Sequence, residues 1–252
     1  MVKDSRLQIS PDAESLSRSA AELFVRQAQL SVKARGRYSV ALSGGVTPQR
    51  TYELLAADPF RDQVPWPEVH VFWTDERCVP PDDPRSNEGM IRRLLLERVR
   101  IPASQIHPIR CSQSPQRDAR HYEELLRDFF AEQTSFLDLI VLGLGEDGHT
   151  ASLFPHTPEL KEQKRWVSEG YLAEQDLFRV TLTFPFINRA EMAVFLVSGA
   201  SKAGVLHEVL EGPFTPDRLP AQLIQPANEN LLWIVDREAG SKLEGAPKNR
   251  PV

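Results

Sequence analysis

A histidine set among glycines and acidic residues is the feature of this 252-residue sequence best suited to chemistry. His149 follows the run GLGEDG, and Asp147 lies two positions before it. A neutral imidazole accepts a proton from water near neutral pH, and a carboxylate on its other nitrogen fixes the tautomer. The pair therefore predicts general-base hydrolysis. A surface histidine in a polar turn is the alternative.

The same run also fits the dinucleotide-binding pattern G-x-G-x-x-G. Its glycines are Gly143, Gly145 and Gly148. That pattern requires a full helix directly after the third glycine, but Pro155 and Pro158 interrupt the chain within two helical turns. We therefore do not expect a dinucleotide at this segment.

A glycine pair follows an earlier apolar run, in the text Ser43-Gly44-Gly45-Val46-Thr47-Pro48. The two glycines permit a tight turn that exposes backbone N–H groups, and Thr47 is placed to cap a helix. Free N–H groups at the start of a helix favour an anion such as phosphate. An ordinary strand-to-helix turn remains the alternative.

Charged residues follow the next apolar run, in the text TDERCVPPDDPRSN. Asp75 and Glu76 could accept sugar hydroxyls, and the planar guanidinium of Arg77 could pair with phosphate. The prolines would hold residues 85 and 87 in a rigid loop. A solvated charged turn, with Ser86 capping the next helix, would have the same composition.

Lys202 lies near the start of a predicted helix, in the text SGASK. A cation at that end opposes the helix dipole unless an anion lies beside it. The position favours a phosphate partner, and a simple exposed lysine is the alternative.

The elements that must position these residues alternate between short apolar strands and amphipathic helices. Strands are expected at 38–42, 69–74, 137–142, 179–183, 192–197 and 231–235, with helices opening at Ser10-Pro11, at Thr47-Pro48 and at 201–210. A further helix is expected from the apolar stripe between Tyr122 and Phe130. This alternation predicts an α/β fold with a doubly wound, mostly parallel, Rossmann-like sheet and helices on both faces. Ligands of such sheets bind beyond the carboxyl ends of the strands, here after Leu42, Thr74, Leu142 and Val197. We expect one catalytic domain over 1–237 and a polar tail over 238–252.

Composition narrows the classes of function. The net charge of −5 and the absence of a basic stripe argue against a nucleic-acid partner. Cys78 and Cys111 form no CxxC pair and no disulfide framework, which suits a reducing compartment. No apolar run reaches the length of a membrane span and no signal peptide is expected, so the cytoplasm is the predicted location. The six histidines show no metal-binding spacing, and no G-x-S-x-G elbow surrounds Ser43 or Ser152.

The motifs taken together resemble the glucosamine-6-phosphate isomerase/6-phosphogluconolactonase family. The similar text runs from about 38 to 235 and includes SGGVTP, FWTDERCVPPDDPRSN, LDLIVLGLGEDGHTASLFP, RVTLTFP and SGASK. The resemblance implies hydrolysis of 6-phospho-D-glucono-1,5-lactone to 6-phosphogluconate in the oxidative pentose phosphate pathway. It implies no cofactor, no metal and no obligate protein partner. By matching position, His149 would be the general base and Asp147 its supporting carboxylate. Substrate and phosphate would be bound by Ser43, Gly44, Gly45, Thr47, Arg77, Lys202 and, as an additional contact, Arg179.

Two positions depart from the pattern of the family, and two others distinguish its lactonases from its deaminases. Val46 stands where a small polar or basic residue is common, and Glu88 where an aromatic is common. The deaminases carry a glutamate five residues after the histidine, where this chain has Phe154, and an aromatic in place of Arg77. Both differences favour the lactonase activity. A sugar-phosphate sensor of related fold would need an added DNA-binding domain, which about forty residues before the first strand do not supply.

Overall fold

A seven-stranded sheet in which every pair of neighbours is parallel organises the protein. The computed structural model describes residues 6–111, 114–131 and 136–244. The strand order is β1-β10-β9-β6-β2-β3-β5. In that order the strands are Arg6–Ser10, Leu231–Asp236, Ala193–Val197, Leu139–Gly143, Tyr38–Leu42, Val69–Trp73 and Ile106–His107. The predicted doubly wound parallel sheet is confirmed.

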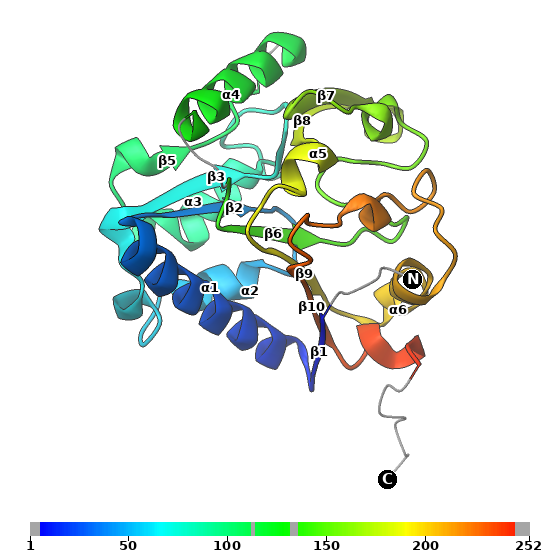
Figure 1. The fold of residues 1–252 in the computed structure, drawn as a ribbon, viewed down its shortest axis with the longest axis horizontal. Coiled ribbons are helices and arrows are strands. Elements are labelled where there is room, and N and C mark those ends of the chain that lie inside the picture. The colour runs from blue at the N-terminus through cyan, green and yellow to red at the C-terminus, as the bar shows by residue number, and fades with distance from the viewer. Residues whose placement is uncertain (1–5, 112–113, 132–135, 245–252) are drawn as a thin grey trace.

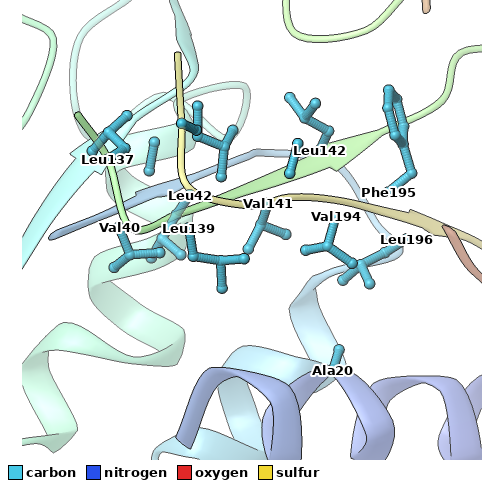
Figure 2. Close-up of a cluster of buried hydrophobic side chains, with 14 of the residues drawn as sticks. Ala20, Val40, Leu42, Leu137, Leu139, Val141, Leu142, Val194, Phe195 and Leu196 are labelled. Atoms are coloured by element: carbon cyan, nitrogen blue, oxygen red, sulfur yellow. The ribbon is translucent and has the colours of Figure 1, made fainter. Parts of the chain in front are cut away.

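Side chains that alternate along the strands form a core on each face of this sheet. Figure 2 shows Val141 and Val194 directed toward helix α1 (Ala13–Arg35), with Leu142 and Phe195 directed the other way. All five residues of β2 and of β9 are buried. Such two-sided burial explains why these strands read as continuous apolar runs.

Helices cover both faces of the sheet, as the alternation of elements predicted. Helices α1 and α2 (Gln49–Leu55) lie together on one side (Figure 1). On the other, Phe130 of α4 (Pro115–Phe130) lies between Phe72 of β3 and Phe186 of α5 (Phe184–Ile187), with centroid separations of 6.0 and 6.2 Å. Helix α3 (Asn87–Leu94) begins with Asn87, and helix α6 (Ala203–Glu211) directly follows Lys202.

A second, three-stranded antiparallel sheet was not expected from the sequence. It joins β4 (Asp75–Arg77), β8 (Leu177–Leu182) and β7 (Val167–Leu172) in the order β4-β8-β7. The apolar run at 179–183, predicted as a strand of the main sheet, belongs here because it pairs with β4 instead. Arg77 is in register with Arg179 across this pairing.

Two helix starts differ from the prediction. Ser10 is the last residue of strand β1, and helix α1 begins at Ala13 with Asp12 as its cap; the Asp12 carboxylate accepts a 2.7 Å hydrogen bond from the N–H of Ser15. Thr47 does not cap α2, whose first residue is Gln49. The cap predicted for Ser86 is confirmed, because its Oγ accepts from the N–H of Gly89 at 3.0 Å.

The end of the described chain is folded rather than fully solvated. Residues Ala239–Lys242 form a short 3₁₀ helix, and Ala239 and Leu243 are buried. The core therefore extends beyond the expected boundary at 237, while 245–252 lie outside the described residues. The division into one domain and a tail stays a prediction.

The two cysteines form a disulfide, contrary to the sequence-based expectation. Cys78 follows β4 and Cys111 follows β5, and their Cα atoms are 4.6 Å apart. Strands β3 and β5 are neighbours, so the segments leaving their carboxyl ends meet. This proximity depends on topology, because 33 positions separate the two residues in the sequence. In the described part of the chain, no helix has the length and apolarity needed to cross a membrane.

Candidate active site

A cavity of about 710 Å³ opens at the carboxyl ends of the central strands. The segments after β2, β3, β6 and β9 all contribute to its lining, which is where a parallel sheet places its ligands. The predicted residues that line it are Ser43, Gly44, Gly45, Thr47, Asp75, Arg77, His149, Arg179 and Lys202. The sequence therefore identified the edge of the sheet at which these groups meet.

The imidazole of His149 is held by Asp147 and borders the cavity. His149 Nδ1 lies 2.5 Å from Asp147 Oδ1, and the same oxygen accepts the backbone N–H of His149 at 3.1 Å. Burial alone would raise the pKa of Asp147, but the hydrogen bond to His149 and the interaction with its charge hold that pKa below its ordinary value. An ionised carboxylate can only accept, so Nδ1 donates in both forms of the ring, and in the neutral imidazole Nε2 keeps the free lone pair.

Gly145 is required for the close approach of this pair. A Cβ at that position would lie 2.0 Å from His149 Nδ1 and 2.5 Å from Asp147 Oδ1. The turn continues through Ala151, a non-glycine residue with a φ of 48° that lines the cavity. No α-helix follows Gly148 before Pro158, which agrees with setting aside the dinucleotide pattern. Gly145 is therefore the glycine of this run that the histidine pair requires.

Ser43, which precedes the glycine pair after β2, presents a buried, unpartnered hydroxyl to the cavity. Ser43 is 5% exposed, and within the described residues its Oγ has no hydrogen-bond partner. The carbonyl of Ser43 accepts a 2.7 Å hydrogen bond from the hydroxyl of Tyr52, which anchors the turn. Gly44 lies against Asn87, because a Cβ there would be 1.8 Å from Asn87 Oδ1. Val46, at the family departure, is 83% exposed on the rim.

Asp75 is buried and held from several directions. Its Oδ2 accepts a 2.6 Å hydrogen bond from the hydroxyl of Ser152, and its Oδ1 accepts from Thr74 Oγ1 at 3.1 Å. The side-chain amide of Asn87 donates to the Asp75 carbonyl at 2.9 Å. Asp75 therefore has one fixed orientation at the cavity wall.

Two guanidinium groups stand side by side where β4 pairs with β8. Arg77 Nη1 donates to the carbonyl of Arg85 at 2.6 Å, and Arg179 Nη1 lies 3.9 Å from Asp75 Oδ2. Arg179 is 6% exposed, and burial lowers its pKa against the opposing charge of Asp75. The Nε atoms of Arg77 and Arg179 are both buried without a partner in the part of the chain that the structure describes. Unpartnered buried donors beside a cavity favour an anionic or hydroxyl-rich ligand.

Lys202 contributes a third cation from the start of α6. Its Nζ lies 4.0 Å from Glu146 Oε1, and both residues line the cavity. Asp236 of β10 secures the turn before it, accepting hydrogen bonds from Ser198 Oγ at 2.5 Å and from the N–H of Gly199 at 3.0 Å. The end of β10 thus fixes the turn that follows the neighbouring strand β9.

Phe154 stands directly beside the imidazole. The two ring centroids are 4.3 Å apart, and the guanidinium of Arg179 lies 5.2 Å from the phenyl centroid. This ring supplies apolar packing at the position where the deaminases are expected to carry a glutamate. It offers no group that could transfer a proton.

Several residues at the site were not singled out by the sequence. Ser152 is 77 positions from its partner Asp75, and Asn87 is 43 positions from the glycine that it contacts. Neither contact has a local signal, because each joins segments that are far apart in the sequence. Among the described residues, no group of three or more histidine, cysteine, aspartate or glutamate side chains could hold a metal ion.

Comparison with known proteins places the chain among sugar-phosphate enzymes. Residues 11–233 match the family model described as glucosamine-6-phosphate isomerases/6-phosphogluconolactonase. A 6-phosphogluconolactonase of Synechocystis sp. is 46% identical over 217 residues, covering 84% of this chain and 88% of the relative. One from Nostoc sp. is 40% identical over 241 residues, covering 94% and 98%.

A solved structure agrees with these sequence relatives. The 6-phosphogluconolactonase of Trypanosoma cruzi superposes with a TM-score of 0.83 at 26% identity, covering 97% of this chain and 98% of that one. The match therefore includes both the main sheet and the β4-β8-β7 sheet that carries Asp75, Arg77 and Arg179.

Proposed function

Since the chain belongs to the glucosamine-6-phosphate isomerase/6-phosphogluconolactonase family and acts as a lactone hydrolase within it, we propose that His149 is the general base of the reaction. The reaction is the hydrolysis of 6-phosphogluconolactone in the pentose phosphate pathway. The observation that carries the proposal is the His149–Asp147 pair, whose histidine borders a cavity that Arg77, Arg179 and Lys202 also line. No metal or cofactor enters this scheme.

The phosphate of the substrate is the proposed partner of the cations and of the glycine turn. Arg77 and Lys202 would pair with its charge, while Ser43 Oγ and Thr47 would donate hydrogen bonds beside the exposed backbone of Gly44 and Gly45. The unpartnered Ser43 Oγ and Arg77 Nε support this arrangement. Asp75 and Arg179 would contact the sugar ring, since both are fixed at the adjacent wall.

The chemistry asked of the histidine is modest. Nε2 takes a proton from a water molecule as its oxygen attacks the ring carbonyl, and the imidazolium then returns the proton to the ring oxygen as the ester bond opens. Asp147 keeps Nδ1 protonated and stabilises the imidazolium between these two steps. A positioned base of this kind contributes about 10²–10⁴-fold, and binding through the phosphate adds the advantage of orientation.

Phe154 is the observation that separates this activity from sugar deamination. A deaminase has to open the sugar ring and move several protons, for which a second acid or base beside the histidine is required. The phenyl ring 4.3 Å from the imidazole occupies that place. We therefore expect no ammonia release from glucosamine 6-phosphate.

The test compares the wild type with His149→Ala on freshly prepared phospholactone, with spontaneous hydrolysis subtracted. We expect the variant to lose about 10²–10⁴-fold in kcat. Unchanged turnover in the variant would contradict the role of His149 as base. The unphosphorylated lactone serves as the control for the anchor, and equal kcat/KM values for the two lactones would contradict the roles of Arg77 and Lys202.

The wider setting of the enzyme rests on its sequence. A cytoplasmic location and the lack of an obligate protein partner stay predictions. The lack of a nucleic-acid partner is also a prediction, supported by a net charge of −5 and the absence of a basic stripe.

A further inference from the structure

Glu76 is a buried carboxylate in the middle of the site-bearing strand β4, and the hydrolysis just described does not use it. It is 4% exposed, and its two neighbours on the strand, Asp75 and Arg77, line the cavity. Because side chains alternate along a strand, Glu76 lies on the opposite side, in a small pocket with Glu88 and Arg110. A carboxylate buried in that position needs hydrogen-bond donors around it.

Backbone donors account for most of its contacts. Oε1 accepts the N–H groups of Arg77 at 2.7 Å and of Asn87 at 2.8 Å. Oε2 accepts the N–H of Glu88 at 2.7 Å and the hydroxyl of Ser86 at 3.3 Å. The donors come from both ends of the segment 77–88. One carboxylate thus closes the whole loop between β4 and α3.

Both ends of this loop carry residues that line the cavity. Arg77 is at its first position, with its guanidinium resting on the carbonyl of Arg85 at 2.6 Å. Asn87 is near its last position, where it donates to the Asp75 carbonyl and lies against Gly44. Loss of a hydrogen bond at the Glu76 carboxylate would therefore displace both the Arg77 guanidinium and the Asn87 side-chain amide.

We propose that Glu76 is a positioning residue of the hydrolysis, whose carboxylate ties β4 to the start of α3 and thereby holds Arg77 in its substrate-binding position and Asn87 against Asp75 and Gly44. The inference rests on the proposed role of Arg77 as a substrate ligand. All four contacts are made to donors, so the group has to be an acceptor at both oxygens. An amide would turn an N–H group toward at least one buried N–H, and a protonated acid would have to place its proton among the same donors and accept more weakly; the loop can relieve either change by moving.

Titration of Glu76 offers a second way to observe the same effect. Burial raises its pKa to about 7, against the opposing effect of the backbone N–H donors. The charged and titratable groups facing it are Asp75 and Arg77 on its own strand, Glu88 on α3, Arg110 after β5 and Arg179 on β8. Protonation below neutral pH should weaken substrate binding in the wild type before the fold is affected.

The experiment measures kcat and KM for fresh phospholactone at pH 8 in the wild type, Glu76→Gln and Glu88→Gln. Glu88 is the matched control, since it is equally buried at 4% but its carboxylate pairs with the side chains of Arg92 and Arg110. We expect about a tenfold rise of KM in Glu76→Gln with kcat within threefold of the wild type, and wild-type values in Glu88→Gln. An unchanged KM in Glu76→Gln, or an equal rise in both variants, would overturn the inference.

A pH series keeps the inference testable even if Glu76→Gln does not fold. The KM of the wild type should rise about three- to fourfold as the pH falls from 8.5 to 6.5, because a carboxyl group with a pKa of about 7 is then roughly three-quarters protonated, and Glu88→Gln should follow it. A KM that stays flat over that range in the wild type would overturn the proposal. Loss of the proposed function itself would be recognised separately, as a wild type without activity on the phospholactone.

Discussion

Replacement of Asp147 by asparagine tests the role of the carboxylate behind the catalytic base. The change keeps the size of the side chain and its Oδ1 acceptor, so the 2.5 Å contact with His149 Nδ1 and the 3.1 Å contact with the backbone N–H can both persist. Only the negative charge is removed. The expected effect is therefore the difference between a charge-assisted and a neutral hydrogen bond to an imidazolium.

The solvent exposure of His149 and Asp147 determines how much the charge-assisted hydrogen bond exceeds a neutral one. The side chains of His149 and Asp147 are 30% and 47% exposed, so water screens much of their interaction. A hydrogen bond to a charged group contributes about 1 to 1.5 kcal/mol more than a neutral one in such surroundings. That energy corresponds to a roughly five- to twelvefold loss of kcat. It is far below the loss of about 10⁴-fold that follows when the carboxylate of a fully buried catalytic triad becomes an amide.

The assay is steady-state hydrolysis of fresh phospholactone at pH 8, with spontaneous hydrolysis subtracted. Asp147→Ala, which also removes the acceptor, should lose about 100-fold, between Asp147→Asn and His149→Ala. A second histidine–aspartate pair provides the control: His156 Nδ1 lies 2.6 Å from Asp217 Oδ2 with both side chains largely exposed. Asp217→Asn should keep kcat within twofold. If Asp147→Asn were as inactive as His149→Ala, or as active as the wild type, the reasoning from exposure would be refuted.

Three further predictions concern the cavity and the stability of the fold. Gly44→Ala should raise KM at least tenfold, because its Cβ would lie 1.8 Å from Asn87 Oδ1; wild-type kinetics in this variant would contradict the packing. Reduction of the Cys78–Cys111 disulfide should lower the free energy of unfolding by about 3–4 kcal/mol, from the entropy of a loop with 33-residue separation. Urea unfolding with and without dithiothreitol measures this, and coincident curves would disprove it. Burial is the larger cause, and the charge of the nearby His70 the smaller cause, that lowers the pKa of His107 to about 4. The unfolded chain therefore binds the extra proton first, and about 1–2 kcal/mol of stability should be lost as the pH falls from 6.5 toward 4, after allowance for solvent screening. His107→Gln should lose less over that range, and an equal loss would contradict the assignment.

The sequence predicted the main sheet well because each central strand carries its own signal. Tyr38–Leu42 was predicted with the bounds that the structure has, and the strands at 69, 139, 193 and 231 were predicted to within two residues at either end. Strand β1 was missed because RLQIS is short and largely exposed at the sheet edge, so no apolar run marks it. Strand β8 was assigned to the wrong sheet, since its apolar pattern does not say which neighbour it pairs with.

The site was predictable in its location and less so in its connections. Parallel strands deliver their carboxyl ends to one edge, so residues following each apolar run had to gather there. The contacts of Asp75 with Ser152, of Gly44 with Asn87, and of Glu76 with the start of α3 link positions distant in sequence. Such links depend on the paths of loops, for which the sequence has no periodic signal. The disulfide was missed for the same reason.

The placement of the two ends of the chain has a consequence for biosynthesis. Among the described residues, strand β1 pairs only with β10, and β10 also supplies Asp236, which fixes the turn before Lys202. A nascent chain leaves the ribosome amino end first, so β1 emerges more than two hundred residues before its neighbour. The edge of the sheet stays open and the turn before Lys202 stays unsecured until the last strand has been made. Catalytic competence should therefore arise only after β10 has been made, and chains stopped before residue 231 should have no partial activity.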